Sequence, residues 1–336
     1  WSLALEVEKA QSNVSGLCGL SVDFSKAFDR VPWERVFEIG KIAGLPPSIL
    51  KPLQGMYTTL KRHFRLGGMI GKGFASTNGI LQGCPLSVVL LNLLMQVWAT
   101  AIEQETPCRA RCYADDAQAT GTLTEHIRQA MHVTLEFCRL TGMEMNTKKS
   151  KTWATETDLR GELAHIHVGG QQLDCVCSER FLGAQMAYTR QHTGNRDTLK
   201  RRQEAEAVLA RIETIPLGLE ARAQLVASTV NSKILYDTAV SPLSKRELQR
   251  WRSRICTAIW GRSSPGRCLE LVFTLLCKGH ATVPLQASAF RVISTVKRML
   301  TRHPDLLGLW TDVLGFAHTA VEEMPDANVN THGPAM

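Results

Sequence analysis

The sequence predicts an α+β fold, with an antiparallel sheet backed by helices in its first half and a helical bundle after it. Up to about residue 190 the predicted order is strand, helices, hairpin, helix and strand, which suits one sheet with helices packed on it. From Asn195 onward, apolar residues recur at helical spacing between short Pro and Gly breaks, as in a bundle. Apolar residues make up 44% of the 336-residue chain, which is enough for packed cores. We therefore expect a mixed region over residues 1–190, a basic helical region over residues 191–302 and a partly disordered tail over residues 303–336.

The first half is expected to begin with a helix end and a buried strand. Residues 1–9 have the pattern of a helix already under way, and the chain does not begin with Met, so we expect a fragment of a longer polypeptide. The apolar residues 17–24 predict a strand that presents Asp23 at its end, a rigid position where site residues often lie. A helix over residues 32–43 follows, with Asp29 as its expected cap.

The remaining elements are predicted from periodicity, turn residues and helix-starting prolines. Gly83 allows close backbone approach and Pro85 begins a helix, an arrangement that favours phosphate binding. The predicted strands cover residues 61–66 and 74–81, the two arms of a hairpin at 109–121, the end of a basic turn at 142–152 and a hairpin around residues 169–170. The further predicted helices cover residues 46–60, 85–104, 122–141, 196–213, 217–238, 243–260, 269–277 and 284–301.

Two adjacent carboxylates, Asp115 and Asp116, form the tip of the predicted hairpin in an apolar and aromatic frame. Neighbouring like charges repel, and a turn that buries part of them needs a cation to offset the cost. Such a tip suits a hard divalent cation, which prefers oxygen ligands. The alternative is a solvated turn, because Asp is a common turn residue.

The first strand can lie beside this hairpin in an antiparallel sheet, which would bring Asp23 to Asp115 and Asp116. Three convergent carboxylates without a His or Cys partner favour Mg²⁺ or Mn²⁺ over zinc. Two such ions can activate an attacking oxygen and stabilise a leaving oxygen in an in-line phosphoryl displacement. The residues alone thus predict nucleotidyl transfer or phosphodiester cleavage, and they leave both open.

The net charge of +8 is unevenly distributed along the chain. Residues 189–302 contain 20 basic and 8 acidic side chains, which suits a region that grips a polyanion such as nucleic acid. The alternative is a basic surface that only keeps the helices soluble. No signal peptide is evident, and the longest apolar run, residues 86–99, is interrupted by Asn92 and Gln96 and too short to span a bilayer. We expect a soluble protein of the nucleus or cytoplasm that does not bind a membrane.

Five segments together resemble motifs A to E of reverse transcriptases, in the order and spacing of that family. They are Asp23-Phe-Ser-Lys-Ala-Phe-Asp29, Gly79-Ile-Leu-Gln-Gly-Cys-Pro-Leu-Ser87, Tyr113-Ala-Asp-Asp116, Gly142-Met-Glu-Met-Asn-Thr-Lys-Lys-Ser150 and Phe181-Leu-Gly183. The Ala-Phe-Asp and Tyr-Ala-Asp-Asp forms are similar to those of non-LTR (LINE-type) retrotransposons rather than retroviruses. The resemblance covers about residues 15–190 and implies a polymerase palm there, with a helical thumb and connection over residues 191–302.

The resemblance implies an RNA-directed DNA polymerase that joins a dNTP to the 3′-hydroxyl of a DNA primer on an RNA template. Asp23 and Asp115 would bind two Mg²⁺ or Mn²⁺ ions, with Asp116 as a third carboxylate. Lys149, or alternatively Lys148, would protonate the departing pyrophosphate.

The resemblance also implies contacts with the nucleotide, template and primer. Phe28 would be a steric gate against a 2′-hydroxyl, and Gln82 and Gly83 would line the nascent base pair and template. The implied substrate-binding residues are Phe24, Phe28, Gln82, Gly83, Tyr113 and, as part of the primer grip, Phe181, Leu182 and Gly183.

The sequence departs from the family ahead of motif A. A complete reverse transcriptase has a fingers region there that holds the triphosphate, whereas only about twenty residues precede Asp23, so we expect the fingers to be largely missing. A first alternative is therefore a domesticated, maturase-like RNA-binding protein that keeps the fold without polymerising. A second is a metal-dependent phosphodiesterase on another fold, which would leave Gln82 and Gly83 without a role. The oligomeric state is open.

Overall fold

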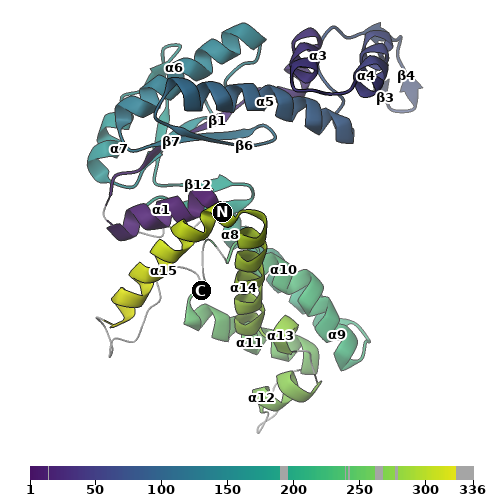
Figure 1. The fold of residues 1–336 in the computed structure, drawn as a ribbon. Coiled ribbons are helices and arrows are strands. Elements are labelled where there is room, and N and C mark those ends of the chain that lie inside the picture. Colours follow the sequence, from purple (N-terminus) through teal and green to yellow (C-terminus); the bar gives the residue numbers. More distant parts are fainter. Residues whose placement is uncertain are drawn as a thin grey trace. The chain divides into compact units, whose positions relative to one another are not determined.

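The structure is a computed structural model that describes residues 1–13, 15–189, 196–238, 240, 243–261, 268–276 and 279–322. The chain divides into two compact units (Figure 1). We call residues Gly16–Cys177 the sheet unit. The other unit combines Trp1–Ser15 with Ser178–Met336, and we call it the helical unit. The α+β class predicted from the sequence is confirmed by this combination of a sheet and helices.

The sheet unit contains helices packed on one main sheet and several short two-stranded ladders. Its elements are β1 (Cys18–Asp23), α2 (Ala27–Arg30), α3 (Trp33–Ile42), α4 (Pro47–Thr59), β2 (Lys61–Arg62), β3 (Arg65–Leu66), β4 (Met69–Ile70), β5 (Phe74–Ala75), α5 (Pro85–Glu105), β6 (Arg109–Tyr113), β7 (Asp116–Gly121), α6 (Thr124–Thr141), β8 (Lys151–Ala154), α7 (Thr157–Leu163), β9 (His167–Val168), β10 (Gln171–Gln172) and β11 (Asp174–Val176).

The main sheet has the strand order β11-β8-β1-β7-β6. Strand β1 lies in the middle, antiparallel to both β7 and β8, and β11 runs parallel to β8 at one edge. Helix α6 packs on β1 and β7, and α5 packs on β6 and α6, so the helices cover the sheet as predicted (Figure 1). Leu20 and Trp98 are fully buried in the core between these layers, where Trp98 Nε1 donates a hydrogen bond to Thr134 Oγ1 (3.0 Å).

A glycine in the central strand makes room for the largest buried ring of the neighbouring strand. Gly19 lies opposite Trp153 in the β1–β8 ladder, and Trp153 is fully buried. A Cβ atom at Gly19 would lie only 2.3 Å from two carbon atoms of the indole ring. The indole therefore packs directly on the β1 backbone, which requires glycine at this position.

Two details of the sheet unit differ from the sequence-based expectations. Helix α3 begins after Pro32, which makes no side-chain cap, and Asp29 lies inside the short helix α2, so its predicted capping role is wrong. The strands expected at 61–66 and 74–81, linked by a glycine-rich turn, do form one hairpin with β2 paired to β5 and β3 paired to β4, but the bounds of its second arm differ. The second arm begins at Met69, directly after a turn at Gly67 and Gly68 in which Gly67 is left-handed with a φ of 57°, and it ends at Ala75.

The helical unit contains one hairpin and a series of helices. Its elements are α1 (Ser2–Asn13), β12 (Ser178–Phe181), β13 (Ala184–Ala187), α8 (Arg196–Thr214), α9 (Leu219–Leu225), the π-helical turn η1 (Val226–Val230), α10 (Asn231–Ile234), α11 (Lys245–Trp260), α12 (Leu269–Leu271), the π-helical turn η2 (Val272–Leu276), α13 (Gly279–Thr282), α14 (Pro284–Arg302), the 3₁₀ turn η3 (Pro304–Leu306) and α15 (Leu307–Glu322). The predicted helices 217–238 and 269–277 are therefore each present in part and include a π-helical turn.

The two ends of the described chain pack together in the helical unit. Leu5 of α1 forms an apolar cluster with Met299, Leu306 and Val313, and α1 contacts α15 along its length. We expected a partly disordered tail over residues 303–336, and residues 304–322 of it are helical because this cluster stabilises them. Residues 323–336 lie outside the described residues.

The division between the units differs from the predicted boundary at residue 190, since α1 and the β12–β13 hairpin belong with the helices.

Helix α5 is longer than its apolar run suggested. With 21 residues it is the one helix in the described part of the chain that is long and apolar enough, by length and composition, to cross a bilayer. Leu91, Leu94 and Trp98 are nevertheless fully buried in the core of the sheet unit. This packing accounts for the buried face of α5, while Leu86, Val88, Val89 and Val97 of the same helix are 40–44% exposed.

Replacing Gly19 by Ala should destabilise the protein by about 1–3 kcal/mol, because the new Cβ overlaps the Trp153 ring and the core must shift. Urea unfolding followed by tryptophan fluorescence measures this. The matched control is Gly161→Ala on α7, where a Cβ meets no atom within 4 Å and the better helix propensity should add roughly 0.5–1 kcal/mol. Equal stability of Gly19→Ala and the parent would contradict the packing of the indole on β1.

Candidate active site

The backbone register of the main sheet brings the predicted carboxylates to one edge. Asp23, the last residue of β1, lies directly opposite Asp116, the first residue of β7. Tyr113 of β6 pairs with Asp116 on its other side, so Asp115 lies in the turn between them. Residues more than ninety positions apart in the sequence therefore meet through main-chain hydrogen bonds. This juxtaposition is the one expected from the sequence.

The turn that carries Asp115 is tight and strained. It consists of only two residues between β6 and β7, and Ala114 has a φ of 54°. This left-handed conformation costs a non-glycine residue roughly 1–2 kcal/mol. The cost is tolerated because the ladder on both sides fixes the turn, and such strain is often found where a side chain must be presented at a defined position.

The three carboxylates influence one another electrostatically. The pKa of Asp116 is raised above its ordinary value of 3.8, first by desolvation and then by the charges of Asp115 and Asp23. All three side chains are therefore close enough to repel. Asp116 keeps an exposed surface, so water screens the repulsion in part. The strand ends form an acidic cluster that a cation would stabilise.

The basic turn before β8 is hydrogen-bonded to the same strand end. Asn146 N donates to Asp23 O (2.8 Å), and Asp23 N donates to Ser150 Oγ (3.0 Å). Lys149 Nζ lies 3.9 Å from Asp23 Oδ1, with 70% of its side chain exposed. Of the two lysines left open by the sequence, Lys149 is thus the one paired with Asp23. Ser150 was not predicted as a site residue; its position directly after the two lysines was the only signal.

The donor set suits a hard divalent ion, because Asp23, Asp115 and Asp116 offer only oxygen ligands and repel one another. In the part of the chain that the structure describes, no three His, Cys, Asp or Glu side chains are already grouped around one point. Holding an ion in common would therefore require the three side chains to turn toward each other at the sheet edge. The chemistry of the residues fits Mg²⁺ or Mn²⁺.

A loop before α5 presents Gln82 and Gly83 to solvent. Its start is fixed by Ile80 N, which donates to Phe28 O (2.6 Å), and by Trp33 Nε1, which donates to Gly79 O (2.7 Å). Gly79 has a φ of 83°, and a Cβ there would lie 2.6 Å from the carbonyl oxygen of residue 29. The loop is therefore held firmly against the segment that follows Asp23.

The other end of this loop is anchored by a tyrosine that the sequence did not indicate. The buried hydroxyl of Tyr57 accepts a hydrogen bond from Leu81 N (3.3 Å) and is 3.2 Å from Ser87 Oγ. A tyrosine on an amphipathic helix gives no sign of this role in the sequence, since ring burial alone would explain it.

Three aromatic residues predicted to bind substrate have different environments. Phe24 is only 3% exposed and its ring packs edge-on against Trp98 and Phe137, so its side chain is a core residue rather than a substrate contact. Phe28 is half-buried, with part of its ring exposed. Tyr113 is 67% exposed beside the acidic cluster. Phe28 and Tyr113 are therefore accessible, and Phe24 is not.

The predicted primer-grip residues lie in the helical unit. Phe181 ends β12, and Leu182 and Gly183 form the turn, both with positive φ. Tyr236 OH donates to Leu182 O (3.2 Å), and Arg201 Nη1 donates to Gly183 O (3.2 Å). The turn is thus attached to the helices of its own unit.

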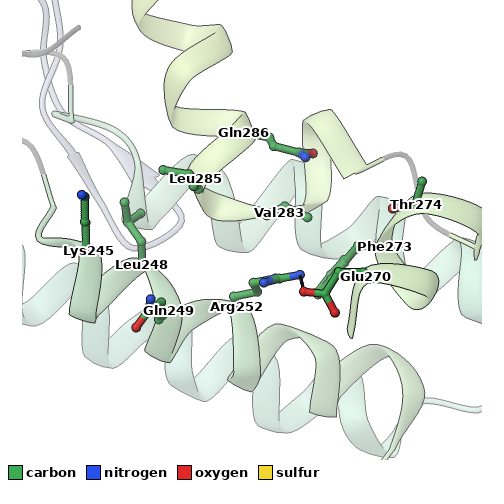
Figure 2. A pocket seen from close by; sticks show the side chains of 10 residues that line it. All are labelled: Lys245, Leu248, Gln249, Arg252, Glu270, Phe273, Thr274, Val283, Leu285 and Gln286. Atoms are coloured by element: carbon green, nitrogen blue, oxygen red, sulfur yellow. Dashed lines mark hydrogen bonds and ion pairs between the residues drawn. The ribbon is translucent and has the colours of Figure 1, made fainter. Parts of the chain in front are cut away.

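A cavity of about 510 Å³ lies in the helical unit between α11, η2 and α14 (Figure 2). Arg252 forms an ion pair with Glu270 (2.8 Å) in its wall and lies over the Phe273 ring, 5.7 Å from the centroid. The lining residues are Lys245, Leu248, Gln249, Arg252, Glu270, Phe273, Thr274, Val283, Leu285 and Gln286. None of them was predicted as a site residue, so this cavity is separate from the acidic cluster.

Comparison with known proteins identifies one matching family model and two curated relatives. The model described as "Reverse transcriptase (RNA-dependent DNA polymerase)" matches residues 2–185, more than half of the chain. The "Retrovirus-related Pol polyprotein from type-2 retrotransposable element R2DM" of Drosophila melanogaster is 24% identical over 139 residues, which cover 39% of this chain and 13% of that protein. The corresponding polyprotein from the type-1 retrotransposable element R2 of Popillia japonica is 24% identical over 147 residues, 41% of this chain and 24% of that protein. The chain therefore spans a quarter or less of either relative.

Among solved structures, telomerases of Candida tropicalis are similar at low sequence identity. The apo telomerase is 10% identical with a TM-score of 0.45, covering 94% of this chain and 56% of that chain. The telomerase in complex with a TWJ fragment of telomeric RNA is 9% identical with a TM-score of 0.43, covering 98% and 50%.

Replacing Asp116 by Asn should raise stability slightly at pH 7 and remove a pH dependence. Because the folded-state pKa of Asp116 is raised, the folded protein binds this proton more tightly than the unfolded chain, so the contribution of Asp116 to stability is fully present below its unfolded-state pKa and is lost as the pH rises through the raised pKa. Asn cannot ionise, so the variant does not lose this stability as the pH rises. Thermal unfolding of parent and variant between pH 3 and pH 8 measures the effect, and a variant that is less stable than the parent at every pH would contradict the assigned repulsion.

Proposed function

Because the chain belongs to the reverse transcriptase (RNA-dependent DNA polymerase) family, we propose that it is an RNA-directed DNA polymerase that extends a DNA primer on an RNA template. The relatives are Pol polyproteins of R2 retrotransposable elements, which agrees with the non-LTR character of its motifs. The observation that carries the proposal is the pairing of Asp23 with Asp116 at the sheet edge where Asp115 is presented.

Asp23, Asp115 and Asp116 are the residues that would hold Mg²⁺ or Mn²⁺. When bound, two such ions stabilise the charge on the attacking and leaving oxygens of the phosphoryl group. The reaction joins the primer O3′ to the α-phosphorus of the dNTP and breaks the bond from that phosphorus to the pyrophosphate oxygen, while the proton of the 3′-hydroxyl passes to solvent water. By holding the cations at the sheet edge, the three carboxylates would determine where the primer O3′ and the α-phosphate are bound.

Lys149 is the residue that would return a proton to the leaving group. Its Nζ carries the proton, lies within 3.9 Å of Asp23 Oδ1 and is on a largely exposed side chain. An exposed ion pair of this length is weak, so the ammonium group can move to a pyrophosphate oxygen at little cost. Transfer from Nζ would neutralise the departing anion.

The loop with Gln82 and Gly83 would line the template and the nascent base pair, and Phe28 would limit the sugar. Both are supported by geometry, because the loop is hydrogen-bonded to the backbone of Phe28 and its apex is exposed. The half-buried ring of Phe28 is fixed by its packing, and its exposed part can exclude a 2′-hydroxyl by steric contact. Tyr113 would contact substrate beside the carboxylates.

We further propose that the sheet unit is the polymerase palm and the helical unit the thumb, with the Phe181–Gly183 segment as part of the primer grip. Many cations of the helical unit are already paired with carboxylates, so they do not supply free charge; these pairs are Arg201–Asp237, Arg202–Glu247, Lys233–Glu204, Arg252–Glu270 and Arg254–Glu206. Lys245, Arg246 and Arg250 of α11 are exposed and form no ion pair in the described part of this unit. They are the better candidates for phosphate contacts.

The Asp115→Asn variant should lose dNTP incorporation on an RNA template with a DNA primer and Mg²⁺ or Mn²⁺. Loss of a charged ligand removes about 4 kcal/mol of transition-state stabilisation, or about a thousandfold in rate. The control is Asp158→Asn, an exposed carboxylate on α7 that should leave extension unchanged. A parent that binds the primer–template but does not extend it, with or without either ion, would favour an RNA-binding protein without polymerase activity.

The Phe28→Val variant should accept ribonucleotides more readily. Replacing the ring by the smaller isopropyl group should reduce discrimination against rNTPs by roughly ten- to a hundredfold, measured as the ratio of kcat/KM values for dNTP and rNTP. Phe24→Leu is the matched control, because Phe24 belongs to the same motif but is buried. It should lower stability without changing the ratio. Equal discrimination in Phe28→Val and the parent would contradict the gate.

A further inference from the structure

The hairpin formed by β2 to β5 carries apolar side chains that nothing in the sheet unit covers. The fraction of each residue that is exposed to solvent is 75% for Phe64, 80% for Leu66, 75% for Met69, 71% for Ile70 and 41% for Phe74. A contiguous group of this kind on a protein surface usually marks an interaction site. Figure 1 shows β3 and β4 beside α4, at the end of the sheet unit that lies away from the main sheet.

The two phenylalanine rings form a stacked pair on this hairpin. Their centroids are 5.0 Å apart with an interplanar angle of 24°. Between the paired ends of the arms, residues 63–64 oppose residues 71–73, so the second arm carries a bulge. Gly73 at this bulge makes room for the His63 ring, to which a Cβ would come within 2.7 Å. The backbone is therefore shaped to hold the rings together at the surface.

The chain around the hairpin contains no acidic residue. No Asp or Glu occurs between Glu38 and Glu103. Lys61, Arg65 and Lys72 are exposed, and among the described residues none of the three forms an ion pair. Stacked aromatic rings flanked by unpaired cations, in a segment of the sequence without carboxylates, are typical of surfaces that bind single-stranded nucleic acid.

The hairpin is also attached to the loop that precedes α5. Arg62, at the base of the first arm, donates from Nη2 to Gly79 O (3.3 Å), and Gly79 begins the loop that exposes Gln82 and Gly83. A strand of nucleic acid that passes this loop would continue directly to the hairpin.

We propose that the hairpin of residues 61–75 binds the unpaired RNA template ahead of the active site. Bases stack on Phe64 and Phe74, and phosphates contact Arg65 and Lys72. The identification of the bound RNA as the template rests on the proposed function. The ability of this surface to bind single-stranded nucleic acid follows from its own side chains and does not depend on that function. Leu66, Met69 and Ile70 at the tip add apolar contacts with the bases.

The test measures binding by fluorescence anisotropy without dNTPs or divalent metal, using the full chain. The labelled probe is an RNA template annealed to a DNA primer, with either two or twelve unpaired template nucleotides. The variants are F64S/F74S for the rings and R65Q/K72Q for the charges. The control is K41Q/I42S on α3, which changes an exposed cation and an 87% exposed apolar residue in the same acid-free segment.

The parent should bind the twelve-nucleotide template about tenfold more tightly than the two-nucleotide one, and F64S/F74S should remove this difference. R65Q/K72Q should reduce the slope of log affinity against log salt by about 1.4, since each single-strand phosphate contact contributes about 0.7. The control should retain both. This binding assay contains no dNTPs, so its outcome does not depend on whether the parent incorporates them. A failure of the polymerase proposal would appear only in the primer-extension assay.

Three results would overturn the proposal. The parent could show no preference for the longer template, or F64S/F74S could keep that preference. The third is that the hairpin variants keep RNA binding but lose flotation with phosphatidylserine vesicles or self-association of the parent, which would assign the surface to a membrane or to a second copy of this chain.

Discussion

The hydrogen-bond ladder around β1 is the constraint on which the candidate site depends. This strand is bonded to β7 on one side and β8 on the other, so the positions of Asp23 and Asp116 are fixed by backbone geometry rather than by side-chain packing. The turn that carries Asp115 and the turn that carries Lys149 are both attached to the ends of these strands. The four groups share one support, and each is placed relative to the others by main-chain bonds.

The same arrangement has energetic costs that the core must offset. Three like charges are held at one edge, and Ala114 adopts a left-handed conformation. These costs are small beside the burial of Leu20, Trp98 and Trp153, since a fully buried large side chain contributes about 1.5–3 kcal/mol or more. Stability thus comes from side chains buried on the central strands, while the sheet edge remains unfavourable until a cation binds, a distribution common in functional sites.

The sequence was sufficient for the parts of the site that depend on strand order. Asp23 ends a buried strand and Asp115 lies in the turn of a hairpin, and an antiparallel sheet leaves few ways to place them apart. It was insufficient where a role depends on which way a side chain points: Phe24 and Phe28 share one motif, yet only Phe28 is exposed. Tyr57 and Ser150 anchor loops through single hydroxyl groups, which leave no periodic trace. The helix after residue 306 was missed because its partner, α1, lies some 300 residues earlier.

The pairing of α1 with α15 also affects how the chain acquires its structure during synthesis. The sheet unit is one continuous segment, so it can close as soon as it has been made. Leu5 of α1 is made before the sheet unit, but its partners Met299, Leu306 and Val313 are made after it. The first helix must therefore remain without its partner while the entire inserted unit is translated. Until α14 and α15 have been made, the apolar side of α1 stays exposed ahead of the sheet unit, and this is the stage at which a chaperone would be needed.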